Sequence, residues 1–179
     1  SKVLCEVLFK PMLGWVLDAA AAAGASDRCV VTGHNCGEVE SYLQSREDGC
    51  ETVRQAERLG TGHAVLQAAD FLSRHAGGHA LILCGDAPLM DAQSIRGAYE
   101  AHIKQGNAVT VISAVVGDPT GYGRILRSEA GGIFGIVEEK NADEGQKAIR
   151  EINSGGYWFS VDGLLAVLGE LPKNPVSGE

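Results

Sequence analysis

The fold is decided by the stretch ALILCGDAPLM, which runs from Ala80 to Met90. Its first five residues are apolar without alternation, which is typical of a strand buried on both faces of a parallel sheet. The apolar run ends at Gly85, and Pro88 prevents the strand from pairing further. Asp86 therefore stands at the carboxyl end of a central strand, where open α/β sheets bind their ligands.

Asp86 has two interpretations. A carboxylate in this place can hold Mg²⁺, because that cation takes oxygen ligands and is usually bound by one or two carboxylates together with substrate phosphates. An aspartate in a loop can also cap the turn or the following helix. The strand pattern alone leaves both interpretations open.

Strands and helices alternate on both sides of this stretch. We expect strands at 29–32, 51–55, 80–84 and 107–116, and helices at 12–23, 37–44, 64–75 and 92–105. Alternation with short connections predicts an α/β fold with a doubly wound, mostly parallel sheet. The pattern has no strand ahead of the first helix, so we expect the chain to begin after the first strand and the glycine-rich phosphate loop that usually follows it.

The pattern changes after Val116. Two short strands, 124–127 and 133–137, flank Ala130-Gly131-Gly132 and predict a β-hairpin. A polar helix at 141–149, a strand at 152–160 and a helix at 161–171 follow. The chain ends without a helix cap or a closing strand, so we expect the C-terminus also to be cut.

Composition narrows the class of protein. A chain of 179 residues with 45% apolar and 21% charged residues is typical of one soluble globular domain. No apolar run is long enough to cross a bilayer, and no signal-peptide pattern opens the chain. Five cysteines without C-x-x-C spacing favour free thiols in a reducing cytoplasm over disulfides or a zinc site. A net charge of −8 without a basic cluster argues against nucleic-acid binding.

Two glycine-containing loops are candidates for backbone contacts to a ligand. Gly60-Thr61-Gly62-His63 opens a helix, whose free N–H groups can meet an anion or a carbonyl; alternatively, Thr61 is a plain N-cap. Gly121-Tyr122-Gly123-Arg124 can bring its backbone to a sugar or a base, or can simply start the hairpin.

Two polar residues follow the later strands. Glu138 can be a site carboxylate at a strand end or part of a solvated charge run with its neighbours. Asn153 can offer its amide to a hydroxyl or shape a turn. Together with Asp86 and Thr61 they predict a polar rim at the strand ends, with Lys2 and Arg124 as candidate phosphate partners.

The order of motifs resembles that of the sugar-1-phosphate nucleotidyltransferases, and within them the N-acetylglucosamine-1-phosphate uridyltransferases. The resemblance rests on Lys2-Val3-Leu4 with Lys10-Pro11-Met12, then QAERLGTGHA at 55–64, GDAPL at 85–89, DPTGYGRI at 118–125, IVEEK at 136–140 and EINSG at 151–155. It covers nearly the whole chain.

The resemblance implies a Rossmann-like nucleotidyltransferase fold in one domain, residues 1–179. Residues 1–116 would bind the nucleotide, and residues 117–179 would bind the sugar through a β-hairpin region. The implied reaction joins UTP and N-acetylglucosamine 1-phosphate into UDP-N-acetylglucosamine and pyrophosphate, with Mg²⁺ as cofactor. The product would feed the cytoplasmic synthesis of cell-envelope precursors such as peptidoglycan and lipopolysaccharide.

The resemblance also implies roles for single residues. Asp86 would hold the Mg²⁺, and Lys2 would add positive charge at the phosphates. The uracil would be read by Gln55 and Gly60, with Thr61 nearby, and Gly85 belongs to the same nucleotide-binding set. The hydroxyls and N-acetyl group of the sugar would be held by Gly123, Glu138 and Asn153, whereas Tyr122 and Arg124 receive no contact.

This sequence departs from the family pattern in several places. The family's glycine-rich signature loop would precede Ser1, and a second metal-ligating asparagine would follow Glu179. An acetyltransferase half, through which many members form homotrimers, would also lie outside the chain. Ser1 and Cys5 stand where the family usually has proline and histidine. The 179-residue chain alone is therefore expected to have little activity.

Two other functions stay open on the sequence. One is a sugar-1-phosphate nucleotidyltransferase of the glucose type. The other is a nucleotide-sugar-binding module that has the fold but does not turn over substrate.

Overall fold

The computed structural model describes residues 1–33, 36–57 and 59–170. In chain order its elements are η1 Lys2–Leu4, β1 Glu6–Val7, β2 Lys10–Pro11, α1 Met12–Ala22, β3 Cys29–Thr32, α2 Gly37–Arg46, β4 Glu51–Arg54, α3 Gly60–Leu66, α4 Ala69–Ser73, β5 His79–Ile82, α5 Ala92–Gln105, β6 Val109–Val115, β7 Arg124–Arg127, β8 Ile133–Val137, η2 Glu139–Asn141, α6 Glu144–Lys147, β9 Glu151–Ser160 and α7 Val161–Leu168. Within this part of the chain, no helix has the length and apolar content needed to cross a lipid bilayer.

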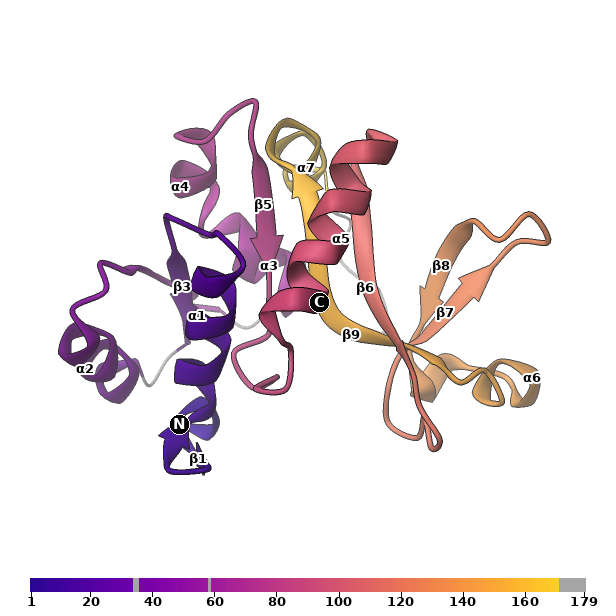
Figure 1. Ribbon diagram of the computed structural model, residues 1–179, viewed down its shortest axis with the longest axis horizontal. Coiled ribbons are helices and arrows are strands. Elements are labelled where there is room, and N and C mark those ends of the chain that lie inside the picture. The colour runs from indigo at the N-terminus through magenta and orange to yellow at the C-terminus, as the bar shows by residue number, and fades with distance from the viewer. Residues whose placement is uncertain (34–35, 58, 171–179) are drawn as a thin grey trace.

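The long strand β9 organises the five-stranded sheet. It pairs antiparallel with β5 on one side and with β6 on the other, so it lies between them (Figure 1). At its beginning it also pairs with β7, where Ile152 stands opposite Arg124. The hairpin of β7 and β8 extends the sheet to the right-hand end of the molecule in Figure 1.

The α/β fold class is confirmed, but the expectation of a mostly parallel sheet is wrong for these five strands. Among the described residues, the parallel pair is β3 with β4, which form a separate two-stranded sheet. β5 and β6 do run in the same direction, because α5 crosses between them. The antiparallel β9 then fills the space between the two, and it is contributed from more than thirty residues further along the chain.

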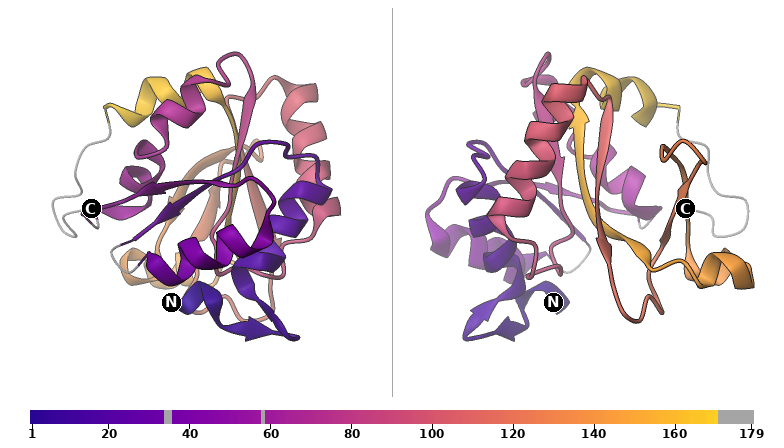
Figure 2. Two further views of the ribbon diagram at one scale, coloured as in Figure 1. Left: turned by 90° about the vertical axis from the view of Figure 1, so that its left-hand side faces the viewer. Right: turned by 45° about the vertical axis from the view of Figure 1, so that its right-hand side comes forward.

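Helices cover both faces of the sheet, which explains the apolar run after His79 (Figure 2). Ala80 and Ile82 pack against a buried cluster from α4 and α7, whereas Leu81 and Leu83 pack against Ile95 and Trp158 beneath α5. The prediction of two covered faces was therefore right. The strand itself ends at Ile82, and the next two residues belong to the loop that leads to Asp86.

Among the helices, α5 has the predicted bounds, and the others differ from expectation mainly in length. α5 keeps its predicted bounds, because the Asp91 side chain accepts the Ser94 N–H and Gly106 ends the helix in the left-handed region at φ 62°. The helix expected at 64–75 is two helices, α3 and α4, and the first begins at Gly60. The polar helix expected at 141–149 shortens to α6, which a capping box between Asp143 and Gln146 begins. Residue 171, the expected end of the last helix, lies outside the described residues.

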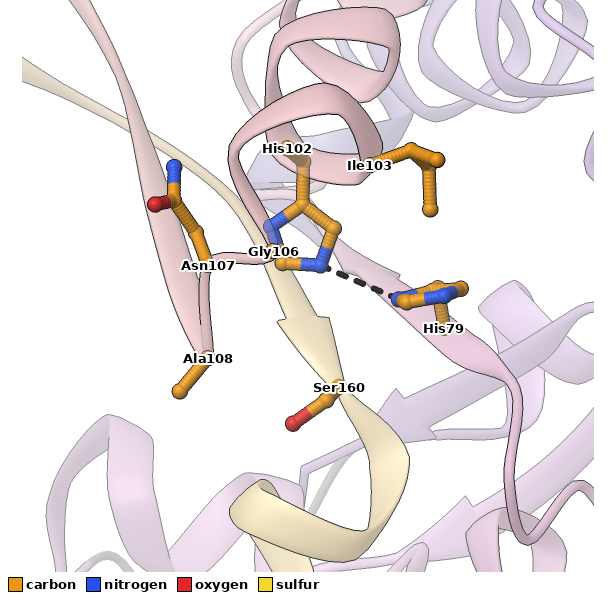
Figure 3. A pocket seen from close by; sticks show the side chains of 7 residues that line it. All are labelled: His79, His102, Ile103, Gly106, Asn107, Ala108 and Ser160. Atoms are coloured by element: carbon orange, nitrogen blue, oxygen red, sulfur yellow. Dashed lines mark hydrogen bonds between the residues drawn. The ribbon is translucent and has the colours of Figure 1, made fainter.

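A pair of histidines lies at the end of the sheet opposite to the loop of Asp86. His102 on α5 is fully buried, and its Nε2 lies 3.0 Å from Nδ1 of His79 on β5 (Figure 3). Its Nδ1 lies 2.9 Å from Oγ1 of Thr110 on β6. The pair borders an open pocket of about 370 Å³. Burial, and then the neighbouring charge of His79, lower the pKa of His102 from its usual 6.5.

This lowered pKa predicts an acid-sensitive stability. The unfolded chain binds a proton at this histidine near pH 6.5, whereas the folded chain resists it, so the free energy of unfolding should fall as the pH drops below 6.5. One differential proton gives a slope of at most about 1.4 kcal/mol per pH unit. Urea unfolding between pH 7.5 and 5 measures it.

The variant His102→Asn should flatten that slope, since asparagine can still meet Thr110 but does not titrate. The matched control is His75→Gln, which removes a histidine in the loop after α4 and so tests whether the loss of any histidine flattens the slope. An unchanged slope in the His102 variant would show that another group causes the acid sensitivity.

Candidate active site

An ion pair joins the N-terminal segment to the loop after β5. Nζ of Lys2 donates a 2.8 Å hydrogen bond to Oδ2 of Asp86. The Asp86 side chain is 38% exposed, so solvent or a ligand can still reach its carboxylate. The hydrogen bond from Lys2 lowers the pKa of Asp86, and the same bond raises the pKa of Lys2. At neutral pH the pair is therefore ionised.

The loop places Asp86 through close packing at Gly85. A Cβ on Gly85 would lie 3.4 Å from Cγ1 of Val3 and 3.5 Å from Cδ1 of Leu13, so this glycine lies directly against the segment that carries Lys2. The alternative in which Asp86 caps the next helix is not supported, because Asp91 caps α5.

A second group of polar residues, Glu138 and Asn153, lies around Gly123. This buried glycine precedes β7, and a Cβ on it would lie 3.1 Å from Oε1 of Glu138 and 3.5 Å from Cβ of Asn153. The backbone N–H of Asn153 also donates to the Gly123 carbonyl at 2.8 Å. The structure thus brings together three residues that the sequence placed on separate strands.

A bulge in β9 sets the direction of Asn153. Ser113 of β6 pairs with Asn153, and the preceding Ile112 pairs with Gly156, so Ser154 and Gly155 are extra residues on β9. Gly155 adopts φ 77°, which favours glycine. Bulges bend a strand and redirect its side chains, and they are common beside active sites.

The two polar groups lie next to each other. Sγ of Cys84, two residues before Asp86, lies 3.6 Å from the Gly155 carbonyl oxygen. On the paired strands, Tyr157 of β9 stands opposite Ile82 of β5, and its hydroxyl donates to Oδ1 of Asn153 at 2.9 Å. The sequence reasoning missed Cys84 and Tyr157, because both look like ordinary members of apolar strands.

A third group lies at the carboxyl end of β4. Nε2 of Gln55 donates to the Gly60 carbonyl at 3.0 Å and lies 3.0 Å from Nδ1 of His63. Thr61 is exposed inside α3, and Leu59 occupies the N-cap position, so the interpretation of Thr61 as an N-cap is wrong. Among hydrogen bonds between described residues, none joins this group to Lys2 or Asp86.

The prediction that Arg124 is a phosphate partner is wrong. Its side chain is 1% exposed and is paired with Glu139, and it also donates to the carbonyls of Tyr122 and Lys147. A guanidinium enclosed in this way cannot reach a phosphate. Arg124 therefore holds the start of the hairpin against α6 and η2, and Lys2 is the exposed cation of the predicted pair.

The residues of this site could supply only part of the coordination shell of a hard divalent cation. Asp86 supplies an accessible carboxylate, and within the described residues no group of three or more histidines, cysteines or acidic residues could hold a metal. Mg²⁺ is usually bound by one or two carboxylates, with substrate phosphates and water completing the shell, so one carboxylate is compatible with it.

Comparisons with known proteins show which family this chain is similar to. A model of the nucleotidyl transferase family matches residues 1–177. The bifunctional protein GlmU of Caldanaerobacter subterraneus subsp. tengcongensis is 44% identical over 178 residues, which is 99% of this chain and 38% of that protein. The bifunctional protein GlmU of Cutibacterium acnes is 42% identical over 182 residues, which is 100% of this chain and 42% of that protein. The chain thus spans about two fifths of the length of these relatives.

Two solved structures share the fold. A Bacillus anthracis protein named as a glucose-1-phosphate thymidylyltransferase, in complex with sucrose, has a TM-score of 0.80 at 22% identity, covering 99% of this chain and 68% of that one. The apo form of a UDP-glucose pyrophosphorylase has a TM-score of 0.74 at 17% identity, covering 94% and 71%. At these identities the likeness concerns the fold alone.

Proposed function

We propose, since the chain belongs to the nucleotidyl transferase family, that its site transfers a uridylyl group from UTP to N-acetylglucosamine 1-phosphate. A phosphate oxygen of the sugar phosphate attacks the α-phosphorus of UTP, the bond to the β-phosphate breaks, and pyrophosphate leaves. The product, UDP-N-acetylglucosamine, would serve the synthesis of the cell envelope. The relatives named GlmU support this choice of substrates.

The proposal rests on the contact between the loop of Asp86 and the bulge in β9. The acidic loop of Asp86 touches the bulge that directs Asn153, through Cys84 and Gly155. The ion pair of Lys2 and Asp86, which is suited to phosphates, therefore lies beside the polar group of Asn153, which is suited to a sugar. This is the arrangement that joining a sugar phosphate to a nucleotide requires, because phosphoryl transfer depends on positioning and on neutralising charge.

The phosphates would meet Lys2 and Asp86. Lys2 is 78% exposed and provides positive charge without acting as a base. Asp86 would hold Mg²⁺ together with the substrate phosphates, and the bound cation would neutralise phosphate charge. Gly85 belongs to this set because it directly precedes Asp86 and lies beside Val3, in the segment that carries Lys2.

The base would be read by Gln55 and Gly60, with Thr61 exposed beside them. Nε2 of Gln55 donates to the Gly60 carbonyl, and among the described residues no hydrogen bond to the amide oxygen Oε1 is formed, so this oxygen would be left for a ligand. An oxygen acceptor matches the N3–H of uracil and does not match cytosine, whose N3 is itself an acceptor.

The sugar would be held by Gly123, Glu138 and Asn153. Gly123 lies close to both of the other side chains, because a Cβ on it would come within 3.1 Å of Oε1 of Glu138. Glu138 is exposed and, as a carboxylate, accepts hydrogen bonds from sugar hydroxyls. We accordingly assign nucleotide binding to residues 1–116 and sugar binding to residues 117–179.

Replacing Glu138 with glutamine should raise the KM for the sugar phosphate about 10- to 100-fold, since a hydrogen bond to a charged group contributes about 1.5–3 kcal/mol. The KM for UTP should stay within about twofold. The matched control is Glu129→Gln in the exposed hairpin turn, which should change neither constant. Equal KM values for Glu138→Gln and the wild type would remove Glu138 from the sugar site.

The function itself is tested by pyrophosphate release in the protein that contains this chain. UTP with N-acetylglucosamine 1-phosphate should give Mg²⁺-dependent release, and glucose 1-phosphate should be a poorer substrate. Faster release with glucose 1-phosphate would favour a glucose-type enzyme. Binding of UDP-N-acetylglucosamine without any release would favour a non-catalytic nucleotide-sugar-binding module.

The setting of the reaction is also a proposal. The five cysteines are unpaired, which fits the reducing cytoplasm. A homotrimer stays a prediction for the whole protein, and its mass in solution would test it.

A further inference from the structure

The amide of Asn153 has a fixed orientation. Its Oδ1 lies 3.1 Å from the backbone nitrogen of Gly155 and 2.9 Å from the hydroxyl of Tyr157. A backbone N–H can only donate, so the amide atom that faces it must be the oxygen. The Tyr157 hydroxyl then donates to the same oxygen, and the two bonds together hold the amide in this orientation.

Tyr157 is placed to keep its proton. It lies on β9 opposite Ile82 of β5, and burial is the first cause that raises the pKa of its hydroxyl. The charges of Cys84 and Glu138 raise the pKa further. At neutral pH the hydroxyl is therefore a donor.

The other end of the Asn153 amide is its nitrogen, Nδ2. Within the described part of the chain, Nδ2 donates to no residue, whereas Oδ1 already accepts two hydrogen bonds. The Cβ of Asn153 and Oε1 of Glu138 both lie beside Gly123, 3.5 Å and 3.1 Å from the place that a Cβ on this glycine would take. Around Gly123 the site thus combines an amide donor with a carboxylate acceptor.

We propose that Tyr157 is a positioning residue that turns the amide of Asn153 so that only its N–H donors face the sugar. The site then requires an oxygen acceptor on the sugar at this point, either a hydroxyl oxygen or the carbonyl oxygen of an N-acetyl group. This inference rests on the proposed function, because it names how that site reads its sugar.

The first test separates positioning from packing. Tyr157→Phe keeps the ring, which packs with its centroid 6.0 Å from that of Phe159, and removes only the hydroxyl. The KM for N-acetylglucosamine 1-phosphate should rise about tenfold, the effect of one hydrogen bond. The values of kcat and the KM for UTP should stay within about threefold. An unchanged KM for the sugar phosphate would overturn the proposal.

The matched control is Tyr99→Phe. Tyr99 packs on Trp158, the residue after Tyr157, and successive residues of a strand point to opposite faces. This variant makes the same chemical change on the other face of β9, so all three kinetic constants should keep their wild-type values. A rise in the sugar KM of the Tyr99 variant equal to that of Tyr157→Phe would assign both effects to packing.

The second test asks which end of the amide faces the sugar. Asn153→Asp replaces the donor end by an oxygen, which repels an acceptor, and should raise the sugar KM about 100-fold or more. If Oδ1 faced the sugar instead, aspartate would be tolerated and the proposal would be wrong. A loss limited to N-acetylglucosamine 1-phosphate identifies the N-acetyl carbonyl as the acceptor, whereas an equal loss with glucose 1-phosphate identifies a hydroxyl oxygen.

A third measurement does not depend on turnover. In a ¹⁵N spectrum of the side-chain amides, Tyr157→Phe should shift the Nδ2 resonances of Asn153, and Tyr99→Phe should not. A wild-type protein without transferase activity but with this shift would refute the proposed function and keep the amide orientation. Activity without the shift would refute the positioning role alone.

Discussion

Replacing Asp86 with asparagine should lower kcat for pyrophosphate release about a thousandfold or more, while the protein stays folded. Asparagine has almost the same size, so the turn after β5 can keep its shape. The substitution removes the negative charge that pairs with Lys2 at 2.8 Å and that would hold a cation at the phosphates. Loss of a single preorganised electrostatic contact typically reduces kcat by about 10²–10³, and here a metal position would be lost as well.

Two comparisons make the Asp86 result specific. Asp70→Asn changes an exposed aspartate in the first turn of α4 and should keep wild-type kinetics. The melting temperature of the Asp86 variant should stay close to that of the wild type, because a solvent-exposed ion pair contributes at most about 1 kcal/mol. A normal rate in a folded Asp86 variant would exclude this carboxylate from the chemistry.

Replacing Arg124 with methionine should destabilise the protein by about 3 kcal/mol, measured by urea unfolding. The guanidinium is 1% exposed and pairs with Glu139, so its removal leaves a partly buried carboxylate without a partner. Carbonyls of two residues, Tyr122 and Lys147, also lose a donor. The affinity of the folded variant for UTP should be unchanged, because the side chain does not reach the phosphates.

The matched control for Arg124 is Arg96→Met. Arg96 is exposed on α5 and donates to the Ala22 carbonyl, so its loss should cost less than about 1 kcal/mol. The opposite outcome for Arg124, a stable variant with weak UTP binding, would restore it as a phosphate partner.

Features of the fold that depend on local sequence could be predicted. The bounds of α5 follow from Asp91 and Gly106, and the strands of the β7–β8 hairpin follow from the glycines between them. The position of β9 between β5 and β6 could not be predicted, because strand order depends on contacts between distant segments. The break between α3 and α4 has no proline or glycine to mark it.

The candidate site was predicted in part for the same reason. The motifs identified Gly123, Glu138 and Asn153, and the structure brings Glu138 and Asn153 together beside Gly123. Tyr157 was missed because its role depends on a bulge that is not visible in the sequence pattern. Arg124 was misjudged because a sequence does not show whether a charged side chain is exposed or enclosed.

The central claim is that Asp86 holds a divalent cation against the phosphates of a nucleotide. It is tested most directly by a crystal structure of the protein that contains this chain, with UTP and with Mn²⁺ in place of Mg²⁺. The anomalous signal of the metal should lie about 2.1 Å from a carboxylate oxygen of Asp86 and beside the phosphates, as expected for a directly bound ion. A metal and nucleotide bound together at a place remote from Asp86 would contradict the claim.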